Sequence, residues 1–583
     1  MSQKKLKRLR KLEKSTDKSF ENVKSKNVSI RDILRKNWKY LLLLCLGIIG
    51  VYFNSLWGDF VSDDYATIPQ NPEIMNIKST MNSSFFINVT KTLTALIFGI
   101  ENPIAYHVVN LLLYLLICVA VFVFLELFFS DLISKVALII FAVLPIHVEA
   151  ISWISGLPYL ISSLLTLWEL IFLVFFIKKR DKKYLFLLII FGLMSIFTDR
   201  IRGFSFVLLS GLMLISFKEE LKIKINLGKV FGIVIVAFGV LMVIAWPMIK
   251  SRVSDVNSGI NASDNIFYNP LFQYPTAIPK YLQLILVPTD LTLYHTMYVL
   301  PIWLNWSIFL LYLIAVVWYF FKNKKIFFAL AFVFLAAAPS MAPIKVSWLV
   351  AERYMFLGSL GIALLLALAV EKFWKKKILV LAVLLVLIGV YSVRIILRNI
   401  DWQTNHNLWV STCQVSPNSH NAWNNIGDDY DKLAANETSD EGKMKQYKNA
   451  IKGFSQSFAI KPNYADAYHN QANIFYKIGR LDLSRQGYET AVSFNPNMPQ
   501  TLNTLIQLDM IEKNNDELKK HTQALMALSP TDVKLLYQIG MLYNQVGLID
   551  EARVIANELY NYFPNVPEIK SFYDLYQKTN IDE

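Results

Sequence analysis

The sequence predicts an all-α protein in which a multi-pass membrane domain is followed by a soluble helical solenoid. Three observations lead to this fold class. The chain is 54% hydrophobic and only 17% charged, whereas soluble proteins carry about a quarter charged residues. Long apolar runs recur up to about Leu397 and then stop, and the polar remainder carries prolines at a constant spacing. The net charge of +14 does not indicate nucleic-acid binding, because much of it lies in short basic clusters beside the apolar runs.

The chain begins with a basic segment, residues 1–38, which holds 13 Lys/Arg against 4 acidic residues. No small-residue cleavage site follows the apolar stretch Tyr40–Val51, so a retained span is expected rather than a signal peptide. We interpret residues 1–38 as a cytoplasmic tail that touches anionic lipid. The three cysteines, Cys45, Cys118 and Cys413, predict no disulfide framework.

The membrane domain is expected over residues 39–397, where apolar runs of about 20 residues, some of them shorter, predict eleven spans. These are residues 39–57, 104–129, 136–151, 158–177, 184–198, 203–217, 229–249, 301–321, 325–340, 354–370 and 377–396.

The basic connections between these runs predict the orientation of the spans. With the N-terminus in the cytoplasm, the even-to-odd connections should also be cytoplasmic, and most of them are rich in lysine. The odd-to-even connections then face outward and include two long external loops, residues 58–103 and 250–300. An eleventh span also places residues 398–583 outside the cytoplasm. The acids, arginines and histidine that are suited to chemistry therefore collect on the outer side.

The C-terminal part carries a repeat. Its prolines recur every 34 residues, at Pro462, Pro496, Pro530 and Pro564. This period is typical of the tetratricopeptide repeat, a helix–turn–helix unit that buries its apolar face by stacking on neighbours. Residues 398–583 are thus expected to form about four repeats, with extra residues around Ala435–Lys445 and a capping helix at Asn565–Lys578. The third unit, residues 499–530, rests mainly on spacing. Such repeats bind protein partners or dock onto the membrane domain, and we favour a protein partner.

Asp63 and Asp64 lie just beyond the first span, in the segment Phe60–Tyr65. Two carboxylates at the mouth of a membrane domain are costly unless water, a cation or a reaction uses them. A structural alternative is that the pair caps a helix beside the membrane or forms an ion pair with Arg353. Catalysis is the favoured interpretation.

Several segments in this order resemble the transmembrane and tetratricopeptide-repeat containing family, which is similar to the protein O-mannosyltransferases of the GT-C class. They cover residues 60–68 with Asn71-Pro72, and residues 106–113, 145–156, 281–288, 351–354 and 359–361. The resemblance implies a GT-C-like transmembrane bundle and an inverting transfer of a sugar, with mannose favoured. The donor would be a polyprenyl- or dolichyl-phosphate sugar, and the acceptor a Ser/Thr hydroxyl of an exported protein presented by the repeats.

The resemblance also implies roles for particular residues. Asp63 would be the catalytic base, and Asp64 would orient the acceptor or a basic neighbour. Arg353 would bind the donor phosphate, with Arg200 and Arg202 as weaker candidates. His147, Glu149, Glu352 and Tyr354 are candidates for lining the pocket. His147 and Glu149 are equally well explained as a structural pair, and Glu352 with Arg353 as an interfacial ion pair.

The donor implied by the resemblance carries a single phosphate, so no metal or other cofactor is expected. Two departures from the family weaken the assignment: Thr198-Asp-Arg200 replaces Ser-Lys-Glu, and Leu157-Pro158 stands where relatives carry an arginine. These departures are compatible with a different donor or a weakened activity.

Two other classes of protein remain open on the sequence. A non-catalytic, membrane-anchored scaffold would use the repeats to recruit envelope proteins. A transporter would show polar residues near mid-membrane in matching halves, and no such symmetry is found. In either case the chain is expected in the cell membrane, or in the endoplasmic reticulum membrane if it is eukaryotic.

Overall fold

A computed structural model describes residues 29–76, 78, 84–198, 204–223, 228, 232, 235, 236, 239, 243, 246, 250, 270–297, 300–338 and 348–577. The chain divides into two compact units, Met1–Ser411 and Thr412–Glu583, whereas the sequence suggested a boundary after residue 397. Every regular element within the described ranges is a helix, so the predicted all-α class is confirmed.

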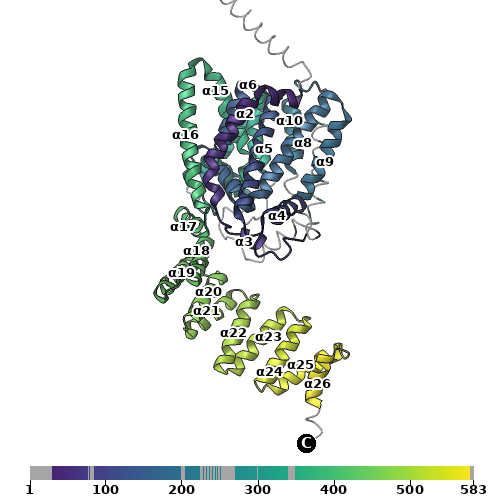
Figure 1. Cartoon of the computed structure of the whole chain (residues 1–583), viewed down its shortest axis with the longest axis vertical. Helices are drawn as coiled ribbons and strands as arrows, with labels where there is room; N and C mark the ends of the chain where they lie inside the picture. Colours follow the sequence, from purple (N-terminus) through teal and green to yellow (C-terminus); the bar gives the residue numbers. More distant parts are fainter. Residues whose placement is uncertain are drawn as a thin grey trace, which may run out of the picture. The chain divides into compact units, whose positions relative to one another are not determined.

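The first unit is a bundle of helices of very different lengths (Figure 1). The α-helices are α2 (Ile30–Tyr52), α3 (Asp64–Thr67), α4 (Phe85–Phe98), α5 (Pro103–Glu126), α6 (Asp131–Ala142), α7 (Val148–Ser152), α8 (Leu157–Lys179), α9 (Lys182–Thr198), α10 (Phe204–Ser216), α12 (Pro270–Leu286), α13 (Ile302–Lys322), α14 (Lys324–Ala337), α15 (Ser359–Phe373) and α16 (Lys377–Asp401). Short 3-10 turns occur at η1 (Phe53–Trp57), η3 (Pro145–His147), η4 (Ile154–Gly156), η7 (Glu352–Met355) and η8 (Trp374–Lys376).

Five helical segments within the described residues are long and apolar enough to cross a membrane. They are Ile30–Trp57, Pro103–Glu126, Ile154–Lys179, Ile302–Lys322 and Ser359–Asp401. A sixth is possible if α6 and the following residues Pro145–Ser152, which bend by 55°, count as one span. The chain is therefore a membrane protein, but the predicted count of eleven spans is not confirmed.

Helix length explains most of the difference in the span count. Helices α15 and α16, which were expected as two spans, fall in the single apolar segment Ser359–Asp401. Helices α9, α10 and α14 have 17, 13 and 14 residues. At 1.5 Å per residue they are roughly 20–26 Å long, less than the roughly 30 Å of a hydrocarbon core. Hydropathy marks their apolar character but does not set their length. The expected span 229–249 lies largely outside the described residues.

The ends of the first unit differ in charge. Lys178 of α8 lies 5.7 Å from the ring of Phe128, and Lys325 of α14 lies 5.8 Å from the ring of Phe129. Because Phe128 and Phe129 follow α5, the basic ends of α8 and α14 meet the end of α5 here. Helices α3 and α4 lie at the opposite end of the bundle (Figure 1). This grouping of basic helix ends at one end of the bundle agrees with the predicted grouping of the basic connections. The side of the membrane that each end faces stays a prediction.

The structure contains helices that the sequence did not predict. Helix α2 begins nine residues before the expected span, because Ser29 and Asp32 form a capping box at its start. Helices α4 and α12 lie inside the two predicted external loops. In α4, the buried side includes Ile87 and Lys91, while Ile97 is exposed.

The second unit consists of paired helices in series (Figure 1). They are α18 (His420–Asn436), α19 (Asp440–Ile460), α20 (Ala465–Lys477), α21 (Leu481–Phe494), α22 (Pro499–Glu512), α23 (Asn515–Leu528), α24 (Val533–Gln545), α25 (Ile549–Tyr562) and the single α26 (Pro567–Gln577). Helix α17 (Asn405–Val415) crosses the division between the units. Helices α18 and α19 have 17 and 21 residues, against 13 and 14 in α20 and α21, so the extra residues of the first repeat lengthen its helices.

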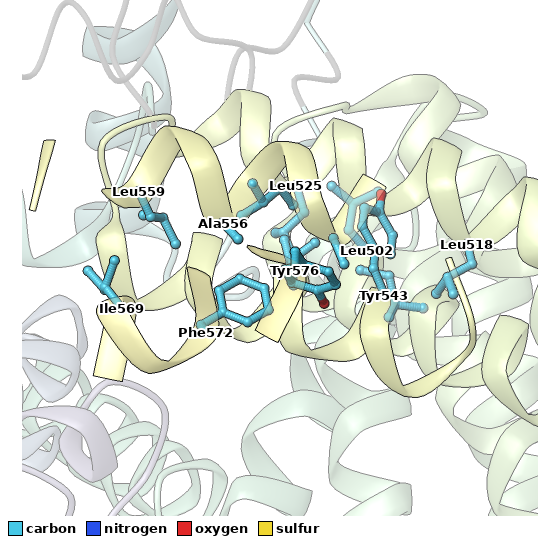
Figure 2. Close-up of a cluster of buried hydrophobic side chains, with 13 residues drawn as sticks. Leu502, Leu518, Leu525, Tyr543, Ala556, Leu559, Ile569, Phe572 and Tyr576 are labelled. Atoms are coloured by element: carbon cyan, nitrogen blue, oxygen red, sulfur yellow. The ribbon is translucent and has the colours of Figure 1, made fainter. Parts of the chain in front are cut away.

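Apolar side chains hold the last repeats together. Figure 2 shows Ile569 and Phe572 of α26 facing Leu559 and Ala556 of α25. The same buried cluster reaches Leu502 of α22, so even the poorly matching third unit contributes to the core. A repeat buries its apolar face only against its neighbours, and α26 covers the end of this series.

A close approach of α14 and α15 gives a stability prediction. A Cβ at Gly361 would lie 2.4 Å from the carbonyl oxygen of Ala329 and 2.6 Å from a methyl of Val333. We expect Gly361→Ala to destabilise the chain by about 1–3 kcal/mol, because neither backbone can retreat cheaply. Thermal unfolding of the full chain in detergent measures the effect. Gly389→Ala in α16, where a Cβ meets nothing within 4 Å, is the control and should be neutral or stabilising. Equal melting temperatures for both variants would contradict the packing argument.

Candidate functional site at the 145–159 corner

The candidate site is built on a broken helix, residues 145–159, which we call the 145–159 corner. The chain makes η3, α7 and η4 in succession before α8 begins at Leu157. Trp153 is extended (φ −82°, ψ 122°) and separates α7 from η4. Only glycine fits at 156, because a Cβ there would lie 2.3 Å from the carbonyl oxygen of Ala150. The interruption frees backbone groups in the middle of the bundle.

Asn110 of α5 compensates for this interruption. Its Nδ2 donates to the carbonyl oxygens of Ile151, Trp153 and Ile154, at 3.3, 2.9 and 3.4 Å. Unpaired backbone carbonyls are costly in a membrane interior. The buried amide therefore fixes the shape of the corner, which in turn positions residues on both of its sides.

The two acids of the predicted pair have different surroundings. Asp64, at the start of α3, is completely buried. Its Oδ1 accepts hydrogen bonds from the Ser155 backbone N–H (2.8 Å) and from the Ser155 hydroxyl, and its Oδ2 accepts from the Val61 N–H (3.1 Å). Asp63 is exposed, and no hydrogen bond to its carboxylate is found within the described residues.

Burial raises the pKa of Asp64 to about 6, although the hydrogen bonds from Ser155 and Val61 and the charge of Lys91 oppose this rise. Lys91 of α4 is 7% exposed and donates from Nζ to the hydroxyl of Thr67 at 2.9 Å. That hydroxyl lies 3.5 Å from the Ser155 hydroxyl. Asp64 and Lys91 are thus joined through two hydroxyl groups in one buried cluster.

Arg353 lies at the same corner. Its Nη1 forms an ion pair with Glu149 of α7, its backbone N–H donates to Glu149 at 2.8 Å, and its Nε donates to the Tyr159 hydroxyl at 3.2 Å. The guanidinium also lies 5.4 Å from the Trp153 ring and 5.0 Å from the Tyr354 ring. No partner of Nη2 is found in the part of the chain that the structure describes.

Arg353 and Tyr354 line a small cavity of about 30 Å³ beside α8. Ser155, which holds Asp64, and Tyr159, which holds Arg353, are four residues apart on a helical stretch, which corresponds to roughly 6–8 Å. The acidic pair and the arginine therefore flank one short segment. The predicted association of Asp63, Asp64 and Arg353 in one region is consistent with this arrangement.

Glu352 points away from this cavity into a second charged cluster. It accepts from the Thr292 N–H and lies 3.4 Å from His295 and 3.5 Å from Arg398 of α16. Arg398 is completely buried and also contacts Asp401 at 2.9 Å. Burial lowers the pKa of His295, so the imidazole is neutral near pH 7. This cluster holds the backbone on which Arg353 is carried.

His147 is not among the residues that line the cavity. Its ring nitrogens lie 3.1 Å from the Tyr114 hydroxyl and 2.7 Å from the Ser359 hydroxyl, and it is completely buried. These contacts fit the structural alternative for His147. Glu149 forms its ion pair with Arg353 and not with His147. Arg200 and Arg202 lie outside the described residues.

Sequence reasoning missed several residues of the site. The sequence did carry a signal for a functional role of Lys91, since Lys91 is a lone cation in an apolar segment. Arg398 carried the same signal near the end of the last span. Ser155 carried none, because its partner Asp64 lies far away in the sequence. Across the described ranges, no three His, Cys, Asp or Glu side chains gather to hold a metal ion, and the prediction that none is needed stays untested.

These features define a membrane protein that carries C-terminal helical repeats. The tetratricopeptide repeat family model matches residues 465–498, which contain α20 and α21. The chain is 23% identical over 569 residues to "Protein O-mannosyl-transferase TMTC3" of Homo sapiens, covering 84% of this chain and 60% of that protein. It is 25% identical over 455 residues to "Protein O-mannosyl-transferase F38B6.6" of Caenorhabditis elegans, covering 71% and 62%.

The predicted resemblance is confirmed: the chain is similar to the TMTC proteins, the transmembrane and tetratricopeptide-repeat containing family. It spans about 60% of the length of the first of these curated relatives. Among solved structures, the crystal structure of MamA protein covers 29% of this chain and 84% of that chain at 14% identity, with a TM-score of 0.23. That score is too low to support an argument.

The contrast between the two acids gives a prediction about stability. Asp64→Asn turns a side-chain N–H₂ toward backbone donors, so we expect it to destabilise the chain by about 1–3 kcal/mol. Asp63→Asn should change stability by less than about 0.5 kcal/mol, because the side chain is exposed. Thermal unfolding of both variants in detergent at pH 7.5 tests the difference. A melting temperature for Asp64→Asn equal to that of the unsubstituted chain would contradict the hydrogen bonding described above.

Proposed function

We propose that this chain is a membrane glycosyltransferase of the GT-C type, which moves a sugar from a polyprenyl- or dolichyl-phosphate donor to a Ser/Thr hydroxyl of an exported protein. Mannose is the sugar that the names of the relatives favour. One observation carries the proposal most directly. An exposed carboxylate, Asp63, stands beside a buried and fully bonded one, Asp64, at the corner that also carries Arg353.

In this proposal Asp63 is the general base. Its carboxylate takes the proton of the acceptor hydroxyl as the hydroxyl oxygen bonds to the anomeric carbon. The bond between that carbon and the phosphate oxygen breaks on the opposite side, so the configuration inverts and the electron pair leaves with the lipid phosphate. Asp63 suits this role because no hydrogen bond must be broken before it accepts a proton. Asp64 positions the turn on which Asp63 lies.

The leaving phosphate gains charge, which requires a cation with a free donor. Arg353 offers Nη2 at the cavity, while Glu149 and Tyr159 hold the rest of the guanidinium in place. Lys91 adds a second buried positive charge near the acidic pair. We assign the site to the non-cytoplasmic side of the membrane, because the basic helix ends lie at the other end of the bundle. The repeats would present the protein acceptor.

A scaffold that lacks catalytic activity is the second candidate. The observation that favours it is the ion pair between Glu149 and Arg353, since a neutralised guanidinium attracts phosphate less strongly. The two proposals differ in what Asp63 does. A scaffold needs no base, so removing that carboxylate would leave its function intact.

Substitution of Asp63 separates the two candidates. We expect Asp63→Asn to lower kcat/KM for sugar transfer at least 100-fold, because general base catalysis contributes about 10²–10⁴-fold. Transfer from a labelled polyprenyl-phosphate mannose to a Ser/Thr peptide, by the full chain in lipid nanodiscs, is the measurement. Asp59→Asn removes another exposed carboxylate four residues away and should transfer normally. Undiminished transfer by the Asp63 variant would refute the assignment.

The pH profile provides a second test. Transfer should decline as the pH falls below about 6, since a protonated Asp64 would turn an O–H toward donors that need an acceptor. The Ser155 hydroxyl stabilises the ionised carboxylate and so lowers the pKa of Asp64. Ser155→Ala should therefore raise this pKa and move the acid limb of kcat/KM to higher pH. Ser155→Thr retains the hydroxyl as a control. An acid limb at the same pH in all three proteins would exclude this role for Asp64.

A further inference from the structure

One face of α8 carries a row of hydroxyl groups beneath Arg353. Ser162, Ser163 and Thr166 lie one turn apart or adjacent on this helix and line the same cavity as Arg353 and Tyr159. All three are buried, with exposed fractions of 5%, 6% and 1%. They belong to a span whose remaining residues are largely apolar. A row of buried hydroxyl groups in such an apolar span therefore requires an explanation.

These hydroxyls lack the partner that helical serine and threonine normally use. Such side chains usually donate to the carbonyl four residues earlier, and Thr90, Thr94 and Thr198 of this chain do so at 2.7–2.8 Å. For Ser162, Ser163 and Thr166 no hydrogen bond is found among the described residues. The Ser162 Oγ is also sealed from solvent.

Unpaired hydroxyls in a membrane interior are unfavourable, since a hydroxyl moved out of water without a partner costs about 1–3 kcal/mol. Three on one face, opening on one cavity, indicate that a polar group occupies the cavity in the working protein. A cavity of about 30 Å³ holds about two water-sized groups. Two oxygens of a larger group would fill the same space.

The chemistry of the lining favours an anion. The cavity offers hydroxyl donors and the Arg353 guanidinium, and no carboxylate is among its lining residues. A sugar presents donors as well as acceptors and is usually met by a carboxylate or amide. A phosphate presents only acceptor oxygens, so a set of donors matches it. Phe356 and Leu357 complete the wall with apolar surface, which suits a phosphate that is attached to a hydrocarbon chain.

We propose that the hydroxyl face of α8, residues Ser162, Ser163 and Thr166, binds the non-reacting oxygens of a prenyl phosphate held by Arg353. This assignment rests on the proposed function in taking the lipid phosphate as ligand, but it concerns binding alone. After transfer, the same hydroxyls would retain the lipid phosphate until it leaves.

Binding of farnesyl phosphate to the full chain in detergent tests the proposal, with farnesol and inorganic phosphate as comparison ligands. We expect farnesyl phosphate to bind most tightly, because only it offers both the anion and the chain. Ser162→Ala and Thr166→Val should each weaken its binding about tenfold, the effect of one hydrogen bond to a charged group. Ser210→Ala is the matched control, since its Oγ is also buried without a hydrogen-bond partner among the described residues but does not line this cavity.

Thermal unfolding without ligand distinguishes binding from a structural role. Ser162→Ala deletes an unpaired buried hydroxyl, so the melting temperature of the free protein should stay the same or rise while binding weakens. Unchanged affinity in both α8 variants would overturn the proposal. Equal binding of farnesol, or of inorganic phosphate, would overturn it as well, by showing an apolar or a free-anion site.

The result of the binding experiment does not depend on whether the protein transfers a sugar. If farnesyl phosphate binds through Ser162 and Thr166 but no sugar is transferred, the lipid phosphate site stands and the transferase proposal fails. If transfer depends on Asp63 but the α8 variants bind and react normally, the transferase stands and this phosphate site is refuted.

Discussion

The structure of the membrane unit depends on a break in a helix where no water is available to solvate it. Between Pro145 and Leu157 the chain runs through η3, α7 and η4, and the extended Trp153 interrupts the helical path. The freed carbonyls need donors inside the protein. Asn110 supplies them from α5. This fixed corner makes two separate contacts: Ser155 donates a hydrogen bond to Asp64, and Glu149 forms an ion pair with Arg353. An irregular backbone at membrane depth is tolerated where protein surrounds it, and here it brings together groups from α3, α4 and η7.

Charge is balanced locally around this corner. Arg353 faces Glu149, and Arg398 lies between Glu352 and Asp401. A buried ion pair gains little stability over an apolar packing of the same volume, whereas the loss of one partner is severe. Pairs of this kind fix geometry more than they add stability. Two neighbouring residues, Glu352 and Arg353, belong to different pairs, so η7 is held from both sides. Among the described residues, the Nη2 of Arg353 has no partner and is available at the cavity.

The two halves of the chain were not equally predictable. The period of 34 between Pro462 and Pro564 predicted the paired helices there, because stacking of like units requires the same contact at the same position. Even the third unit folds as α22 and α23, where leucines replace the usual small and aromatic residues. In the membrane unit, hydropathy found apolar runs but not their lengths or breaks. The role of Ser155 was not predictable, because it exists only through Asp64, 91 positions away in the sequence. Asp63 and Arg353 were proposed from family resemblance, whereas the contacts of Arg353 with Trp153 and Glu149 were not predicted.

Asp63 and Asp64 show how one turn can give neighbouring acids opposite surroundings. Ser62 adopts a left-handed backbone with φ 54°, which is uncommon for a residue with a side chain and costs about 1–3 kcal/mol. It persists because both flanks are held: the Ser62 N–H donates to Asn405 at 2.8 Å, and the Asp64 carboxylate accepts from Val61 and Ser155. Asp63 lies between these anchors, fixed by its backbone and not by its own side chain. A carboxylate held in this way keeps its oxygens available for an incoming hydroxyl, which is what a general base requires.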